Sequence, residues 1–355
     1  MRFSFALIVV AGLAPAIGSA ARQKALQPTR ESLAPPQPYV RISTKDSNLV
    51  QLQIAVRQFV PAHGHGPSVW LAGVSHIGES SYYAALQRFL DARTLVLYEG
   101  IGGAAAHTSG QAHQPSSPAS VDNEEHAPRA RDDYGSLQTA MATSLGLVFQ
   151  LDAIDYSRPN FRNSDLTIEE LRNLLAKAPA DPDKAGAAQG FETLLQAMQG
   201  GTFMNTILKL GLGFLGASQK LQAMGRLAMI EVLGQIQGDP SQLHGLPPQM
   251  EDLLSVLLQR RNQKVFHDLN ANLRDLGSND SIAVFFGTGH MPDLERRLRS
   301  DLHYRPGRQM WLTAFSVNLA KTGITPAEVQ FIRNLVRSQL QQLQAPARTR
   351  QPSSK

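Results

Sequence analysis

The chain has 355 residues, 42% of them hydrophobic, and carries a formal net charge of +5. This length and apolar content are sufficient to build a hydrophobic core. Cysteine is absent, which excludes disulfides, a lipoprotein attachment site, a thiol nucleophile and thiolate metal ligands. Any metal site is therefore expected to use nitrogen and oxygen ligands only. No basic stripe is interleaved with aromatic residues, so we expect no nucleic-acid partner.

Residues 1–20 have the features of a secretory signal peptide. Arg2 precedes an apolar run over residues 3–14, and small residues end the segment at Ala20. The run is shorter than the ~20 residues that cross a bilayer, and no other stretch is long and apolar enough to do so. We therefore predict an exported protein, periplasmic or secreted, without a transmembrane span after signal cleavage. The Pro-rich residues 21–38 are expected to form a flexible linker.

The first candidate for chemistry lies in a strand, helix and strand pattern. Residues 68–72 form an apolar run typical of a buried strand, followed by a Gly-x-x-His sequence at Gly73 and His76. After apolar residues at helical spacing, residues 94–98 form a second such run that leads into Glu99. A crossover of this kind predicts two neighbouring parallel strands. His76 and Glu99 are then expected just beyond the carboxyl ends of these strands, where open α/β sheets bind ligands.

The same pattern recurs near the other end of the chain. Residues 281–286 form another apolar run, followed by a second Gly-x-x-His sequence at Gly287 and His290. Pro292 comes next, at a position that the first turn of a helix accepts. One such tetrapeptide carries little information, but two in matching strand-to-helix contexts form a moderately specific pair. Each glycine is expected to permit a sharp turn that directs its histidine into a shared crevice.

The repeated alternation of buried strands and amphipathic helices predicts the fold class. We expect one α/β domain over residues 39–343, with a central, largely parallel sheet flanked by helices. Residues 102–133 are polar and without a period, which favours a disordered insertion or a lid. Residues 179–276 have a helical pattern throughout and predict a helical insertion. Residues 344–355 are expected to form a disordered basic tail.

Two assignments stay open. The first is the element over residues 50–56, which fits both a strand and a helix. The second is the role of two aspartates that follow residues 147–151, a segment that favours another strand. Asp152 and Asp155 follow that strand. They are candidates for further metal ligands or general acids beside Glu99, or for caps of a turn.

The paired Gly-x-x-His sequences, Glu99 and the helix that contains Arg261 resemble the TraB/PrgY and Tiki family, also called TraB/GumN, of metal-dependent hydrolases. The resemblance covers residues 40–315. It implies a site of two histidines and one glutamate, which Tiki-type members use for metal-dependent peptide cleavage. TraB-type bacterial relatives are associated with inhibition of peptide pheromones. Several relatives carry a membrane anchor, and this chain differs from them there.

The resemblance assigns roles residue by residue. It implies that His76, His290 and Glu99 are metal ligands and that Gly73 and Gly287 are the motif glycines. Neutral imidazole and carboxylate ligands suit a divalent Zn²⁺, Mn²⁺ or Co²⁺ ion. Three protein ligands leave a coordination position open, at which the ion activates water.

Glu99 and Arg261 are the candidate catalytic residues. Arg261 matches an arginine that the family places on the helix before the second motif, where its planar donors suit a substrate carboxylate or a developing oxyanion. We therefore expect a peptidase-type hydrolase that acts on an exported peptide or small substrate. One alternative is a non-catalytic protein that sequesters such a ligand. Another is that both histidines and Glu99 merely hydrogen-bond in a polar core.

Overall fold

The computed structural model describes residues 34–100, 136–176, 218–235 and 248–344. The predicted signal peptide, most of the linker, the insertion at residues 102–133 and nearly all of the basic tail lie outside the described residues. So do two parts of the predicted helical insertion. Among the described helices, none is both long and apolar enough to cross a membrane.

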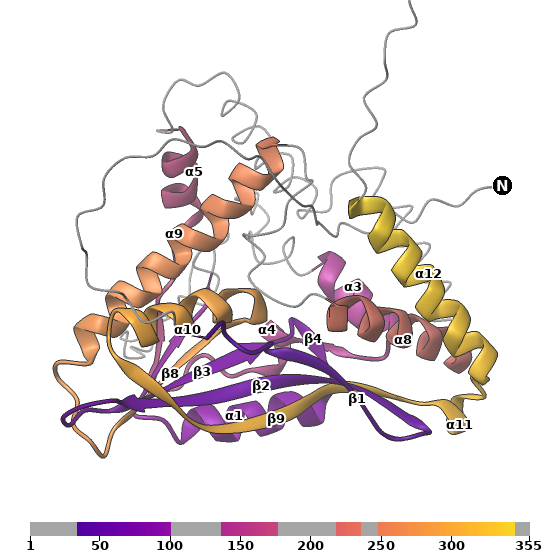
Figure 1. Ribbon diagram of the computed structural model, residues 1–355, viewed down its shortest axis with the longest axis horizontal. Coiled ribbons are helices and arrows are strands. Elements are labelled where there is room, and N and C mark those ends of the chain that lie inside the picture. The colour runs from indigo at the N-terminus through magenta and orange to yellow at the C-terminus, as the bar shows by residue number, and fades with distance from the viewer. Residues whose placement is uncertain (1–33, 101–135, 177–217, 236–247, 345–355) are drawn as a thin grey trace, which may run out of the picture.

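A mixed sheet forms the centre of the described domain (Figure 1). Its seven strands are Val40–Asp46 (β1), Leu49–Pro61 (β2), Ser68–Val74 (β3), Leu95–Tyr98 (β5), Phe161–Asn163 (β7), Ser281–Gly287 (β8) and Tyr304–Asn318 (β9). They follow the order β1-β2-β3-β8-β5-β7, and β9 also pairs with β2. β3, β8, β5 and β7 are mutually parallel, whereas β1, β3 and β9 are each antiparallel to β2. The predicted α/β class is confirmed.

The prediction that β3 and β5 are neighbours is wrong. They are parallel, but β8 lies between them and pairs with both, for example through Ala283, which is in register with Trp70 and Val96. A local strand, helix and strand pattern predicts the direction of its strands, yet a strand from far along the chain is free to insert between them. The insertion is central to the site, because it brings the end of β8 between the ends of β3 and β5.

Helices cover both faces of the sheet. Their bounds are Ser80–Asp91 (α1), Ser136–Ser144 (α3), Gln150–Ala153 (α4), Ile168–Ala176 (α5), Gln219–Gln235 (α8), Pro248–Asn272 (α9), Met291–Ser300 (α10), Leu319–Thr322 (α11) and Pro326–Gln344 (α12). A short 3₁₀ turn, Thr288–His290, joins β8 to α10. Thr167 with Glu170 and Thr325 with Glu328 form capping boxes at the starts of α5 and α12.

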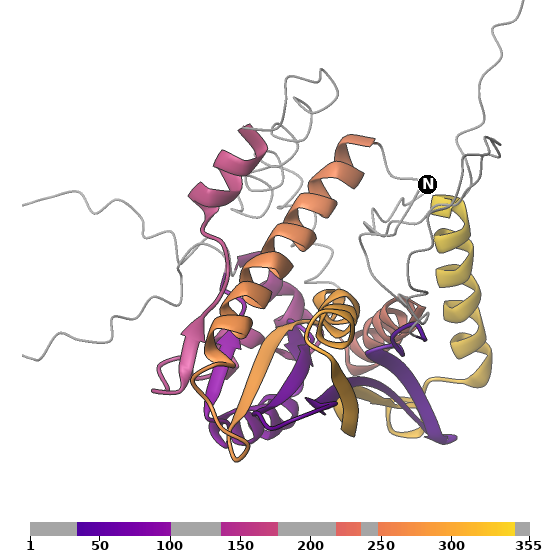
Figure 2. The same cartoon turned by 60° about the vertical axis from the view of Figure 1, so that its left-hand side comes forward.

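Alternate residues of each strand point to opposite faces of the sheet, so two hydrophobic clusters form, one on each face. These clusters pack the helices against the sheet. On one face, Ala55 and Phe59 of β2 pack with residues of α9 and α10, which lie side by side in Figures 1 and 2. On the other, Leu52 and Ile54 of β2 pack with residues of α1, α3, α8 and α12. Residues 50–56, which fitted both a strand and a helix, therefore belong to strand β2, which buries Val50, Leu52, Ile54 and Val56 in one cluster and Ala55 in the other.

A small second sheet lies beside the end of β3. Ile77–Gly78 (β4) pairs antiparallel with Val148–Phe149 (β6), and α4 begins directly afterwards at Gln150. The strand predicted over residues 147–151 is therefore shorter than expected and lies outside the main sheet. Its apolar run is explained by burial of Leu147 and Phe149 in the hydrophobic cluster that includes α1.

Candidate functional site

The predicted site residues meet at one edge of the sheet. His76 follows β3, Glu99 follows β5, and His290 ends the 3₁₀ turn after β8, so the order β3-β8-β5 brings three strand ends together. Nε2 of His290 lies 3.7 Å from Oε1 of Glu99. A Cβ atom at Gly287 would lie 3.3 Å from Oε2 of Glu99 and 3.5 Å from Nε2 of His76. Nε2 of His290 therefore lies beside the Glu99 carboxylate, and Nε2 of His76 and the same carboxylate border the Gly287 backbone.

The motif glycines are required for space and not for the sharp turn that the sequence predicted. Neither Gly73 nor Gly287 has a positive φ angle; at Gly287 φ is −50°. A Cβ at Gly73 would lie 3.1 Å from Cγ2 of Thr288, so its absence lets the turn after β8 approach β3. At Gly287 the absent side chain leaves room for the carboxylate and imidazole that lie against its backbone.

Glu99 is the acidic centre of the cluster. Its Oε2 accepts a 2.6 Å hydrogen bond from the backbone N–H of Gly287, and its Oε1 accepts a 2.6 Å bond from Nη2 of Arg261. Burial alone would raise the pKa of Glu99, but Arg261, the two histidines and the Gly287 N–H together hold it below its ordinary value. The side chain is therefore a carboxylate at neutral pH. Each oxygen also keeps one lone pair free of these bonds.

Asp165, which follows β7, is a second buried carboxylate that no sequence motif indicated. It binds Arg261 in a fork, with Nε to Oδ1 at 2.8 Å and Nη2 to Oδ2 at 2.6 Å. The backbone N–H groups of Gly100 and Leu166 also donate to it. Four donors thus satisfy Asp165, whose side chain is 0% exposed. Asp165 is placed to hold Arg261, whereas Glu99 has oxygen lone pairs left for another ligand.

Arg261 is more constrained than its predicted role as a free substrate-binding group implies. Its Nε and Nη2 are engaged by Asp165 and Glu99, so only Nη1 remains for a substrate, and Nη1 also contacts Nε2 of His290 at 3.4 Å. Burial opposes its charge, but Glu99 and Asp165 outweigh this effect and raise the pKa of Arg261. Two carboxylates around one guanidinium leave a net charge of about −1 at the edge of the sheet, which favours a cation.

The two histidines differ in exposure. His290 is buried, with a side chain that is 5% exposed, and burial lowers its pKa to about 4 although Glu99 opposes the shift. His76 is exposed. Nδ1 of His76 contacts the amide oxygen of Gln150 at 2.9 Å, and Nδ1 of His290 contacts the amide oxygen of Asn262 at 2.6 Å. The site is therefore closed on the His290 side and open on the His76 side.

The donor set fits a divalent cation in chemistry and partly in distance. Two ligands that share a tetrahedral ion at ~2.1 Å lie about 3.4 Å apart, which is close to the 3.7 Å between Nε2 of His290 and Oε1 of Glu99. Nε2 of His76, on the other side of the Gly287 backbone position, would be the third donor. Within the described residues, no group of three or more His, Asp or Glu side chains already has the spacing of a metal site.

Other candidates from the sequence lie away from this cluster. Asp155 accepts hydrogen bonds from the backbone N–H and hydroxyl of Ser157, which is the turn-capping alternative, and Asp152 is exposed on α4. Two further histidines of a His-x-His sequence, His63 and His65, are exposed on the loop before β3 and also lie outside the cluster.

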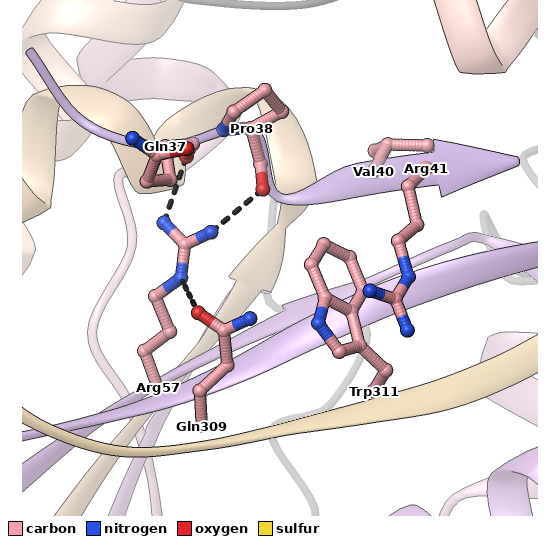
Figure 3. Close-up of a pocket in the computed structure, with 7 residues that line it drawn as sticks. All are labelled: Gln37, Pro38, Val40, Arg41, Arg57, Gln309 and Trp311. Atoms are coloured by element: carbon pink, nitrogen blue, oxygen red, sulfur yellow. Dashed lines mark hydrogen bonds between the residues drawn. The ribbon is translucent and has the colours of Figure 1, made fainter.

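A pocket of about 340 Å³ lies elsewhere, between the segment that precedes β1 and strand β9 (Figure 3). Arg57 donates to the backbone oxygens of Gln37 and Pro38, both at 2.7 Å, and to the side-chain oxygen of Gln309 at 2.9 Å. It also pairs with the buried Glu295 of α10. These bonds attach the segment before β1 to the sheet, and none of the residues that line the pocket belongs to the candidate site.

Comparisons of the chain with protein-family models, curated proteins and solved structures give no match. The resemblance to the TraB/PrgY and Tiki family therefore stays a prediction, which rests on the motif residues themselves. The geometry supplies an independent observation. Four residues assigned from separate parts of the sequence, His76, Glu99, Arg261 and His290, lie within one cluster.

Proposed function

We propose that the chain is an exported, metal-dependent hydrolase of the peptidase type. The observation that carries the proposal is a carboxylate with free lone pairs that lies 3.7 Å from Nε2 of His290 and borders the same glycine, Gly287, as Nε2 of His76. His76, His290 and Glu99 would hold one divalent ion, of which Zn²⁺, Mn²⁺ and Co²⁺ suit these ligands. Such an ion supplies a bound water whose pKa is lowered toward ~7, and a Lewis acid for the substrate carbonyl.

The residues of the chain contribute the rest of the chemistry. His290 is neutral at pH 7, because its pKa is about 4, so its Nε2 lone pair is available as a ligand. Asp165 holds Arg261 by a fork of two bonds, which fixes the position of Nη1. Nη1 is then the group that would donate to a developing oxyanion without reorganising. His76 lies on the exposed side, from which a peptide would enter.

The second candidate function is sequestration of a peptide without turnover. The observation in its favour is the locked state of Arg261, which binds two carboxylates and is 6% exposed. An arginine that is engaged in this way serves as well to build a rigid binding surface as to assist catalysis.

His76→Ala distinguishes the two functions, because His76 is exposed and its removal is not expected to unfold the chain. The mature wild-type protein and the variant would be incubated with a peptide library and Zn²⁺, Mn²⁺ or Co²⁺, and the products identified by mass spectrometry. We expect cleavage by the wild type and at least ~100-fold slower cleavage by the variant, with His65→Ala as the control on another exposed histidine. Sequestration predicts uncleaved peptides that both proteins bind equally.

Gly287→Ala tests whether the space at the end of β8 matters. The added methyl group would lie 3.3 Å from Oε2 of Glu99, so the carboxylate must shift by a few tenths of an ångström, whereas its 3.5 Å distance to Nε2 of His76 is an ordinary contact. We expect a folded protein whose affinity for the divalent ion falls by about 10-fold, measured by calorimetry. Gly277→Ala is the control, since its nearest neighbour would be 3.8 Å away. Equal affinity in all three proteins would contradict a crowded site.

A further inference from the structure

Asn262, the residue after Arg261 on α9, is a buried polar side chain with no place in the chemistry above. It lies between His290 and Asp293, both buried and both at the start of α10. Its Nδ2 group donates to Oδ2 of Asp293 at 3.0 Å, and its Oδ1 atom lies 2.6 Å from Nδ1 of His290. Asn262 thus joins the buried histidine to a carboxylate at the far side of the turn.

The orientation of the Asn262 amide follows from Asp293. Two guanidinium groups fix this carboxylate: Nη1 of Arg296 donates to Oδ1 at 2.6 Å, and Nε of Arg297 donates to Oδ2 at 2.7 Å. An ionised carboxylate is an acceptor only, so the NH₂ group of Asn262 must face it. The amide oxygen is then left for His290.

An amide oxygen is also an acceptor only, so the ring nitrogen that it contacts must carry the proton. Nδ1 of His290 is therefore protonated, and Nε2 bears the lone pair that faces Glu99 and Nη1 of Arg261. We infer that Asn262 is a positioning residue, which fixes the tautomer and ring orientation of His290 and is itself oriented by Asp293. The inference rests on the proposed function only for its consequence, the supply of a ligand lone pair to the site.

The contact between His76 and Gln150 is weaker evidence of the same kind. The NH₂ group of Gln150 faces the hydroxyl of Tyr156 at 2.9 Å, and a hydroxyl both donates and accepts. The orientation of this amide is therefore not imposed by its neighbour. The Asn262 amide differs, because its neighbour Asp293 is a carboxylate that can only accept a hydrogen bond.

Histidine tautomers are measured by long-range ¹H–¹⁵N correlation spectra of metal-free protein with ¹⁵N-labelled histidine. The His290 signals are identified by their absence in His290→Gln. We expect the Nδ1–H tautomer in the wild type. In Asn262→Leu, which lacks the acceptor, part of the population is expected to carry the proton on Nε2, which lies 3.7 Å from Oε1 of Glu99. Gln263→Leu is the matched control, because Gln263 is the next residue of α9 and is exposed.

Asp293→Asn is the second variant, and it decides the question if Asn262→Leu fails to fold. It keeps the shape of the side chain but adds a donor, so the Asn262 amide becomes free to turn and a mixture of His290 tautomers is expected. An unchanged Nδ1–H tautomer in Asp293→Asn and, where it folds, in Asn262→Leu would overturn the inference. So would an Nε2–H tautomer in the wild type.

Calorimetry with Zn²⁺ alone then measures the consequence for the site. Loss of a group that orients a metal ligand typically lowers affinity 10- to 100-fold, and we expect a loss of about this size in Asn262→Leu. Because the spectra need neither metal nor turnover, the two proposals fail separately. If the wild type binds no ion, but the His290 tautomer differs between the wild type and the variants, the proposed function is contradicted and the inference stands.

Discussion

Replacing Asp165 with alanine is expected to lower the free energy of unfolding by about 3–5 kcal/mol, measured by urea denaturation. Asp165 is completely buried and makes both bonds of the fork to Arg261, whose own side chain is 6% exposed. Without it, a buried guanidinium keeps only Glu99 as an anionic partner, and the N–H groups of Gly100 and Leu166 lose their acceptor. A loss of this size is a large part of the stability of a typical domain.

The matched control for Asp165 is an exposed ion pair. Arg158 contacts Asp91 and Asp155, but its side chain is 46% exposed, so Arg158→Ala is expected to cost less than about 1 kcal/mol. Equal losses in the two variants would contradict the view that Asp165 is the buried support of Arg261. The thermal midpoint gives a second estimate of the same difference.

Glu99→Gln is expected to have the largest effect on function. Glutamine keeps the size of the side chain and an acceptor for the Gly287 N–H, but it removes the charge that the two histidines face. It also brings an NH₂ group into a position beside donors of Arg261. We expect affinity for the divalent ion and peptide cleavage to fall together, each by at least ~100-fold, because removal of a ligand should cost no less than removal of a group that orients one.

Glu79→Gln is the control for this substitution. Glu79, at the start of α1, is another partly buried carboxylate, and it accepts hydrogen bonds from the backbone N–H and hydroxyl of Ser316 in β9. Among the described residues, its contacts include neither His290 nor Arg261. Its replacement is expected to leave ion affinity and cleavage unchanged. A Glu99→Gln protein with wild-type ion affinity would show that the carboxylate is not a ligand.

The sequence was sufficient to predict the candidate site where a residue directly follows a buried strand. Glu99 does so, His76 and His290 lie within the turns that follow their strands, and parallel strands bring their carboxyl ends to the same edge. The order of the strands was not predictable in this way. Insertion of β8 between β3 and β5 depends on packing between segments far apart in the chain, which no local pattern records.

The residues that the sequence did not reveal share a different property. Asp165 follows β7, which has only three residues and no apolar run. The sequence therefore did not predict a strand there, nor a site residue after it. Asn262 lies within a long helix, where a polar residue is usually exposed; its burial and its contact with His290 depend on how α9 packs against α10. Arg261 was found only through the family resemblance, and its two carboxylate partners were not foreseen.

Calorimetric titration of the metal-free mature protein with Zn²⁺, Mn²⁺ and Co²⁺, beside His290→Gln, tests the central claim most directly. His290 is the buried donor, and its Nε2 lies 3.7 Å from Glu99, so it is the histidine whose loss should most weaken a shared ion. We expect one ion per chain for at least one of these metals in the wild type, and an affinity at least ~100-fold lower in the variant. Equal binding by the two proteins, or no binding of any of the three ions by the wild type, would contradict it.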